Sequence, residues 1–243
     1  MSSTLFDKIP GPESREPVLR SLRSFYLIVL FIIIAILIVV SFEMRFFLKE
    51  LVVHEAERDA IRISSAIRDH EIGRLVKRKE NGQYYLALSQ EEMLKLDQEL
   101  RIFLASFDIV KIKIFNAETQ IIYSTDSKVI GKLDTANTKL AKALSGDATS
   151  RYENKDSIWD LTSEERIDVK LVETYVPISS LNGKIIGSFE IYKDITHDLM
   201  IVNKILIRVV GILLIITMSI FGGVVFVMYR ASNARQATRP SQD

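Results

Sequence analysis

The three histidines are the first candidates for metal ligands or proton carriers. His54, His70 and His197 lie far apart in the chain, and no two of them have the H-x-x-x-H or H-E-x-x-H spacing of a zinc site. The chain has no cysteine, which excludes thiol catalysis, disulfides and cysteine-based metal sites. We therefore expect no metal site and no cofactor.

The serines and glycines form no recognisable enzyme motif. Ser124, Ser145 and Ser188 do not lie in a nucleophile elbow, and the glycines do not gather into a phosphate-binding loop. We therefore expect no catalytic residue in this chain and do not classify it as an enzyme.

Acidic and aromatic residues alternate in the last two predicted strands. Because successive side chains of a strand point to opposite faces, Ser188, Glu190 and Tyr192 share one face, and Glu173 and Tyr175 share a face of the preceding strand. Polar and aromatic side chains on one face suit a small-molecule pocket. The ordinary alternative is that exposed strand faces carry Glu and Tyr without binding anything.

These strands belong to a predicted α+β domain. Period-two alternation over residues 110–124 predicts a hairpin, and residues 171–177 and 184–192 predict a strand pair with a Leu-Asn-Gly turn between them. A strand is expected at residues 149–153. Residues 155–165 are charged and loop-like.

Helices complete the predicted domain. Ser89 to Glu92 form a capping box that opens a helix, residues 132–144 suit a short helix, and Asp194 caps an exit helix. This order predicts an antiparallel sheet backed by a long N-terminal helix.

That long helix has no predicted break, because residues 18–72 contain neither Gly nor Pro. An apolar seam with steps of three and four predicts packing on a partner surface. Two surfaces fit it: the domain's own sheet, or a second copy in a coiled coil. The run is short for a coiled coil, which favours the sheet. The seam consists of Val53, Ala56, Ala60, Ile63 and Ile67.

Charge and length limit the remaining possibilities. The 243 residues include 32 Lys+Arg and 31 Asp+Glu, with a net charge of +1. This balance gives no electrostatic basis for a nucleic-acid partner. Once two strongly apolar runs are set aside, residues 43–208 remain, which is enough for one domain with its own core.

The apolar runs, Phe25–Phe42 and Val209–Tyr229, are free of charge and long enough to span a membrane as helices. A cleaved signal peptide is the alternative for the first run. It would end in small residues, whereas Glu43 to Phe46 follow here. We therefore expect an uncleaved anchor.

Basic residues in the short flanks predict the orientation of the spans, because such residues stay on the cytoplasmic side. Both termini are predicted to be cytoplasmic, with residues 43–208 outside. The predicted segments are a tail (1–24), a span (25–42), the outer domain (43–208), a span (209–229) and a tail (230–243). The flanking residues are Lys8, Arg15, Arg20 and Arg23 before the first span, and Arg230, Arg235 and Arg239 after the second.

The outer domain resembles the single Cache sensor domains, PAS-like extracytoplasmic modules of bacterial histidine kinases, diguanylate cyclases and chemoreceptors. The arrangement of anchor, long helix, domain and exit span carries the resemblance, together with several short patterns. These are Val110 to Phe115 entering a hairpin, Tyr123 to Asp126 with Ile130-Gly131 after it, Ala143 to Gly146, Glu173 to Pro177, and Gly187 to Asp194.

The resemblance implies a pocket on the outer side of the sheet, covered by residues 155–165. Trp159 would then provide an aromatic wall, and Arg151 and Tyr152 are close enough in the chain to join the pocket. An arginine can hold a ligand carboxylate with two hydrogen bonds. The implied ligand-binding set is Arg151, Tyr152, Trp159, Glu173, Tyr175, Ser188, Glu190 and Tyr192.

The function implied is that of a sensory receptor in the bacterial inner membrane with a periplasmic domain. It would bind a small metabolite such as a carboxylate or amino acid, act as a homodimer, and signal to a cytoplasmic output. The residues from Arg230 to Asp243 are too few for a kinase or cyclase module, so a separate output protein or a longer receptor is expected. The alternative is a non-sensing envelope protein that uses the domain to dock other proteins.

Overall fold

The computed structural model describes residues 16–162 and 164–237, with side chains for residues 24–71, 73–162 and 164–230. Among the basic residues used to orient the spans, the side chain of Arg230 is described. Lys8, Arg15 and Arg239, and the side chains of Arg20, Arg23 and Arg235, lie outside the described part. The predicted orientation of the termini stays a prediction.

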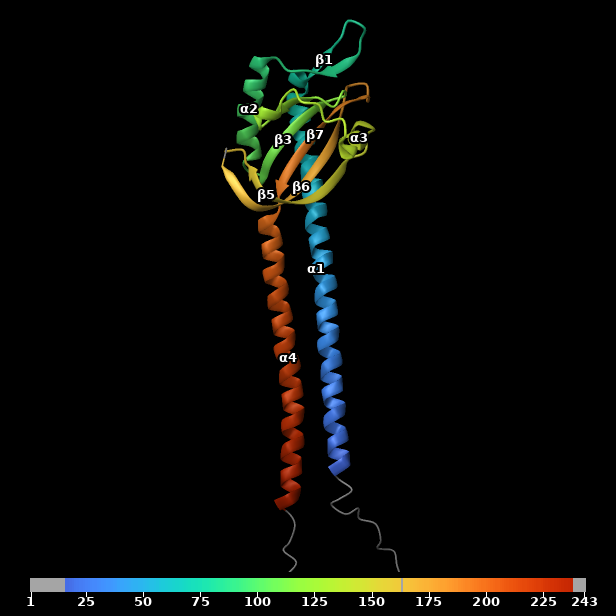
Figure 1. Ribbon diagram of the computed structural model, residues 1–243, viewed down its shortest axis with the longest axis vertical. Coiled ribbons are helices and arrows are strands. Elements are labelled where there is room, and N and C mark those ends of the chain that lie inside the picture. Colours follow the sequence, from blue (N-terminus) through green and yellow to red (C-terminus); the bar gives the residue numbers. More distant parts are fainter. Residues whose placement is uncertain (1–15, 163, 238–243) are drawn as a thin grey trace, which may run out of the picture. The chain divides into compact units, whose positions relative to one another are not determined.

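The chain forms two compact units. One is Phe47–Val202, which lies within the predicted outer domain; the other contains the chain up to Phe46 and from Asn203 onwards. Figure 1 shows the elements of both units in order along the chain. They are α1 (Glu16–Leu75), β1 (Val76–Arg78), β2 (Tyr84–Leu86), α2 (Gln90–Leu104), β3 (Ile109–Asn116), β4 (Ile121–Ser124), the 3-10 turn η2 (Ser127–Val129), α3 (Thr138–Leu144), β5 (Thr149–Trp159), β6 (Glu165–Ser179), β7 (Ile185–Asp194) and α4 (Thr196–Ala237).

Two helices are long and apolar enough to cross a membrane, over Ser24–Glu71 within α1 and Thr196–Arg230 within α4. They contain the predicted spans 25–42 and 209–229. Large side chains on both remain exposed, including Phe31 and Ile215. Such surfaces suit a lipid environment, in which apolar side chains need no protein cover.

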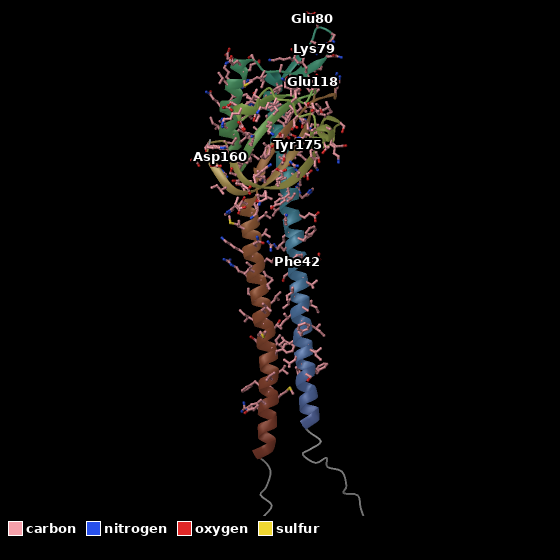
Figure 2. The ribbon with its side chains drawn as sticks, viewed as in Figure 1. Phe42, Lys79, Glu80, Glu118, Asp160 and Tyr175 are labelled. Atoms are coloured by element: carbon pink, nitrogen blue, oxygen red, sulfur yellow. The ribbon has the colours of Figure 1, made fainter. Side chains whose placement is uncertain are left out.

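The unit Phe47–Val202 is built on a five-stranded antiparallel sheet with the order β4-β3-β7-β6-β5. β7, the last strand in sequence, lies in the centre, between β3 and β6. Figure 2 shows Tyr175 among these strands, whereas Lys79 and Glu80 lie at the tip of the separate β1-β2 hairpin. The α+β class predicted from the sequence is confirmed.

One face of the sheet is covered by α1 and α2. Ala60, Ile63 and Ile67 of α1 are buried in the same cluster as Ile112 and Ile191 of the sheet. The apolar seam of the long helix therefore packs on the domain's own sheet, as favoured from the sequence. The α2 capping box is also present, because Ser89 Oγ accepts from the Glu92 backbone and the Glu92 carboxylate accepts from the Ser89 backbone.

The opposite face carries α3. Leu140 and Ala143 of this short helix are fully buried against Phe115 and Tyr175. The helix is shorter than the predicted 132–144 because Asn137 caps it, accepting from the backbone N–H groups of Lys139 and Leu140. α3 therefore covers only part of this face, next to the polar residues of β6 and β7.

The segment 155–165 is not the loop predicted from its charge. Lys155–Trp159 continues β5 and pairs with β6 up to Trp159 opposite Glu165. Strand pairing satisfies the backbone groups of this segment, and its charged side chains can point to solvent from an edge strand. The connection itself is a turn in which Asp160 Oδ1 accepts from the backbone of Thr162 and Glu164.

Candidate functional site

The sheet register brings the predicted polar residues together. Glu173 lies between Arg151 of β5 and Tyr192 of β7, so these three form one row across the sheet. In the next row, Tyr175 pairs with Glu190, and Glu190 pairs with Lys113 of β3. Side chains directly opposite each other in neighbouring strands lie close enough to interact. Two acids, two phenols and two cations therefore meet on the face of the sheet that carries α3.

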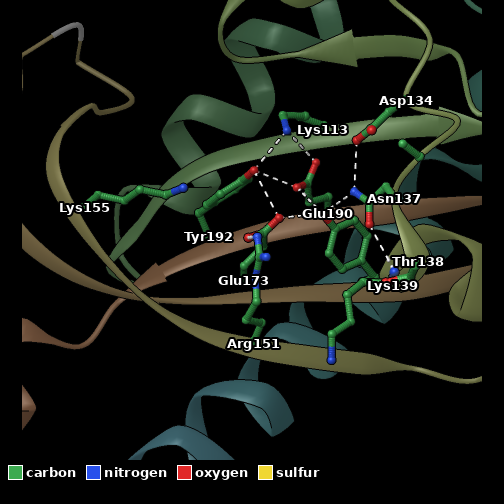
Figure 3. Close-up of a pocket in the computed structure, with 12 residues that line it drawn as sticks. Lys113, Asp134, Asn137, Thr138, Lys139, Arg151, Lys155, Glu173, Glu190 and Tyr192 are labelled. Atoms are coloured by element: carbon green, nitrogen blue, oxygen red, sulfur yellow. Dashed lines mark hydrogen bonds and ion pairs between the residues drawn. The ribbon is translucent and has the colours of Figure 1, made fainter.

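These residues form the floor of an open pocket of about 400 Å³ beside the N-terminus of α3 (Figure 3). This volume is near the lower end of the range found for small-molecule sites. The pocket is lined by Lys113, Asp134, Ala136, Asn137, Thr138, Lys139, Arg151, Lys155, Glu173, Tyr175, Glu190 and Tyr192.

Two phenol groups connect the two carboxyl groups of the floor. The Tyr175 hydroxyl lies 2.5 Å from Glu173 Oε1 and 2.6 Å from Glu190 Oε1. The Tyr192 hydroxyl lies 2.6 Å from the same Glu190 oxygen and 3.3 Å from Glu173 Oε1. All four side chains are buried, which places their polar atoms where a missing hydrogen bond is costly.

A cation faces each carboxyl group. Arg151 Nη2 donates to Glu173 Oε2 at 2.9 Å, and Lys113 Nζ lies 2.7 Å from Glu190 Oε2. The lysine contact is an ion pair without hydrogen-bond geometry, so no donor among the described residues points at Glu190 Oε2. Lys113 Nζ instead donates to the Tyr192 hydroxyl at 2.9 Å.

Burial separates the pKa values of the two acids. It raises the pKa of Glu190 to about 7, with Glu173 adding to the effect and Lys113 opposing it. Burial acts in the same direction on Glu173, but the adjacent Glu190 and hydrogen bonds from Tyr175 and Arg151 outweigh it and hold the pKa of Glu173 well below its usual range. Burial and the nearby carboxyl groups also raise the pKa of Tyr175 and Tyr192, so both remain protonated phenols.

Asn137 connects α3 to the floor. Its side-chain oxygen caps the helix, while Nδ2 donates to the Tyr175 hydroxyl at 2.8 Å and to Asp134 at 2.9 Å. Asparagine is one of the preferred capping residues because its oxygen accepts from free backbone N–H groups. One side chain thus fixes both the start of α3 and the orientation of a floor phenol.

The rim of the pocket is cationic and open to solvent. The Arg151 side chain is 49% exposed and that of Lys155 is 41% exposed. Lys139 Nζ makes a contact of 3.3 Å to the backbone oxygen of Ser150. Arg151 and Lys155 both pair with Glu153, which lies outside the pocket lining. An anion entering the pocket would therefore meet three partly solvated cations, two of which share this carboxylate.

Five of the predicted ligand-binding residues line this pocket: Arg151, Glu173, Tyr175, Glu190 and Tyr192. No contact with a ligand tests their role, which stays a prediction.

The other three lie elsewhere. Tyr152 faces the opposite side of the sheet, where it packs near Ala56 and Val172, with Lys49 Nζ 3.7 Å from its ring centre. Trp159 is 61% exposed at the end of β5. Ser188 is fully buried and donates to backbone oxygens of Val176 and Phe189.

Sequence reasoning did not select Lys113, Asn137 or Lys139 for the pocket, and it placed Lys155 only in the predicted covering loop. Lys113 alternates with apolar residues in its strand, which indicated only that it points away from the core. Its place beside Glu190 depends on β3 pairing with β7, a strand far away in sequence. No local pattern specifies that pairing.

A second polar cluster lies at the end of α1. His70, Glu71 and Glu99 place possible ligand atoms within 4.8 Å of one another. Arg74 Nη1 lies 2.6 Å from Glu99 and 3.1 Å from Glu71. The guanidinium thus already neutralises these carboxylates, and the cluster fits an ion-pair network better than a metal centre.

The sequence matches no protein-family model and no curated protein. Its structure is similar to solved sensor domains. These include the Escherichia coli DcuS sensor domain (TM-score 0.31, 15% identity, 47% of this chain and 71% of that chain) and the Vibrio cholerae histidine kinase DctB sensor domain (0.35, 10%, 63% and 58%). A third is the PAS domain of Bordetella pertussis BvgS (TM-score 0.27, 14% identity, 44% of this chain and 92% of that chain).

The identities and TM-scores of these matches are too low to transfer a ligand or an activity. The chemistry of the pocket must therefore come from its own residues.

Proposed function

We propose that this chain is a membrane-anchored sensory receptor whose domain Phe47–Val202 binds a small anionic metabolite, most simply a carboxylate. The observation that carries the proposal is the polar pocket, in which buried acids and phenols lie beneath a cationic rim. A few polar groups placed around a concave site are typical of small-molecule recognition.

The charge of the pocket favours an anion. The pocket lining has four cations against three carboxyl groups: Lys113, Lys139, Arg151 and Lys155. Glu153, just outside the lining, pairs with two of these cations, Arg151 and Lys155. The raised pKa of Glu190 reduces the negative charge further near neutral pH. Arg151 is already positioned by Glu173, and its exposed guanidinium has further donors for a carboxylate.

Strand β7 connects the pocket directly to α4, so ligand binding can act on the membrane-spanning helices. β7, which carries Glu190 and Tyr192, ends at Asp194, and α4 begins two residues later. Ile195 and Leu199 pack with Ala56 of α1 and Val172 of β6 in one buried cluster. A ligand that stabilised one arrangement of this cluster would shift a two-state equilibrium toward it.

Protein docking is the second candidate. Trp159 is 61% exposed and Ile167 is 78% exposed, and both belong to the β5-β6 pair at the edge of the sheet. An edge strand with exposed apolar side chains can take part in a protein contact. In that case crosslinking in membranes would capture another protein through this edge, and ligands would leave the domain unaffected.

A thermal unfolding screen tests the sensory proposal. The full chain in lipid nanodiscs is heated with carboxylates, amino acids and neutral metabolites of similar size. A ligand at about 100 times its Kd stabilises the folded state by about 2.7 kcal/mol. We expect a carboxylate to raise the unfolding midpoint selectively, whereas a domain that no anion stabilises would favour docking.

A further inference from the structure

Three short oxygen-to-oxygen contacts meet at the floor of the pocket. Tyr175 Oη lies 2.5 Å from Glu173 Oε1, and Glu190 Oε1 lies 2.6 Å from both Tyr175 Oη and Tyr192 Oη. Each distance is that of an O–H···O hydrogen bond, so each contact requires one proton between its oxygens. Without that proton, two oxygen lone pairs would face each other in a buried site.

The two phenols supply only two of these protons, because a hydroxyl group has a single hydrogen. The neighbouring nitrogens do not supply the third. Asn137 Nδ2 donates to the Tyr175 hydroxyl and Lys113 Nζ donates to the Tyr192 hydroxyl. Neither nitrogen therefore places a proton between the two oxygens of any of the three contacts. The missing proton must therefore lie on a carboxyl group.

The missing proton is more stable on Glu190 than on Glu173. Glu190 is 1% exposed, and its Oε1 takes part in two of the three contacts. With a proton on this oxygen, Glu190 donates to Tyr175, Tyr175 donates to Glu173, and Tyr192 donates to Glu190. Glu173 remains ionised, because Arg151 donates to its other oxygen.

We infer that Glu190 and Glu173 together hold one exchangeable proton at neutral pH, which makes the pocket floor a proton-binding site that responds to pH.

The surrounding charges keep this proton exchangeable. Lys113 of β3 stabilises the deprotonated form of Glu190, whereas the ionised Glu173 of β6 destabilises it. On the covering side, Lys139 and Asp134 lie at the pocket wall with opposite charges. The raised pKa of Glu190, about 7, agrees with a group that gains and loses its proton near neutrality.

The consequence for ligand binding rests on the proposed function. Loss of the proton adds a negative charge beneath the position of the anion, so an anionic ligand binds more weakly at higher pH. Acid and ligand would then favour the same state of the domain. The proton can be tested without any ligand, so the two proposals can fail separately.

The test is infrared difference spectroscopy of the full chain in lipid nanodiscs, titrated from about pH 5.5 to about pH 8.5 without added ligand. A protonated carboxylic acid has a C=O stretching band that a carboxylate lacks. We expect the loss of one such band in the wild type as pH rises. Glu190→Gln should lack the transition, because an amide cannot lose this proton. Asp156→Asn, which changes an exposed carboxylate of β5 outside the pocket lining, should retain it.

Lys113→Met is an independent variant. Removing the cation should raise the midpoint of the transition by about one pH unit or more, because the deprotonated form loses its ion pair. A wild-type spectrum without the transition, or a transition that survives in Glu190→Gln, would overturn the inference. An unchanged midpoint in Lys113→Met would also overturn it.

Discussion

At the scale of single residues, Glu173 and Glu190 show how position alone gives one side chain type two electrostatic roles. Both are buried, yet Arg151 stabilises the charge on Glu173, while Glu190 has its Oε1 between two phenols. The lowered pKa of Glu173 and the raised pKa of Glu190 follow from these partners. One acid therefore keeps its charge across the physiological range and the other titrates within it.

The pH dependence of binding follows from this difference. Below the raised pKa of Glu190, about 7, the floor has one negative charge fewer, so anion affinity is highest there and falls as pH rises through that value. A charge at about 8 Å and an effective dielectric constant of about 20 contributes about 2 kcal/mol, or roughly thirtyfold in Kd. Titration calorimetry at several pH values would measure this change. Glu190→Gln should make the Kd nearly independent of pH, and a wild-type Kd that stays constant would contradict the account.

At the scale of elements, the N-terminus of α3 contributes a hydrogen-bond donor, the Asn137 side chain, to the pocket floor. Asn137→Asp should leave α3 intact, because aspartate also caps helices, but it replaces the amide donor to Tyr175 with an oxygen. We expect weaker binding of an anion by about tenfold, with little loss of helix content. Asn137→Ala is the comparison, since it removes the cap as well and should lower the free energy of unfolding by about 1 kcal/mol. Calorimetry and circular dichroism distinguish these outcomes.

The packing of β7 predicts that the stability of the domain is sensitive to substitution of Gly187. A Cβ atom at Gly187 would lie 2.2 Å from the Phe115 backbone oxygen and 2.3 Å from Leu86 Cδ1. Because the neighbouring backbone cannot move away easily, Gly187→Ala should destabilise the domain by about 2 kcal/mol or more. Gly73→Ala is the control: its Cβ meets nothing within 4 Å, and alanine favours a helix. Chemical denaturation should show a loss for the first variant and no loss for the second.

The elements also show what the sequence could predict. Local signals were sufficient for the capping box of α2, the apolar seam of α1 and the alternating faces of β6 and β7. They wrongly predicted a loop at residues 155–165, where β5 continues to Trp159, because an edge strand tolerates the charged side chains that are typical of loops. The pocket depends on strand order and on the position of α3, which arise from contacts distant in sequence. For this reason Lys113 and Asn137 could not be selected in advance.

At the scale of the whole molecule, the two apolar helices predict a membrane topology. Both termini should lie on one side of the membrane and residues 47–202 on the other. The chain contains no cysteine, so single cysteines can be introduced without a background. An impermeant thiol reagent added to intact cells should label Glu118→Cys, in the exposed β3-β4 turn, while a cysteine at Ser241 reacts only after the membrane is opened. Equal labelling of both positions in intact cells would contradict this topology.

Titration calorimetry of the full chain in nanodiscs measures whether the pocket on β6 and β7 binds a small anion. Wild-type protein is titrated with the carboxylate that gives the largest thermal shift, alongside Arg151→Gln and the exposed-site control Lys184→Gln. We predict saturable binding in the wild type and the control, and a loss of about tenfold or more in Arg151→Gln, because a charge-assisted hydrogen bond contributes about 1.5 to 3 kcal/mol. Binding of equal strength in all three proteins would contradict the assignment of the site, and the absence of carboxylate binding in the wild type would contradict the function.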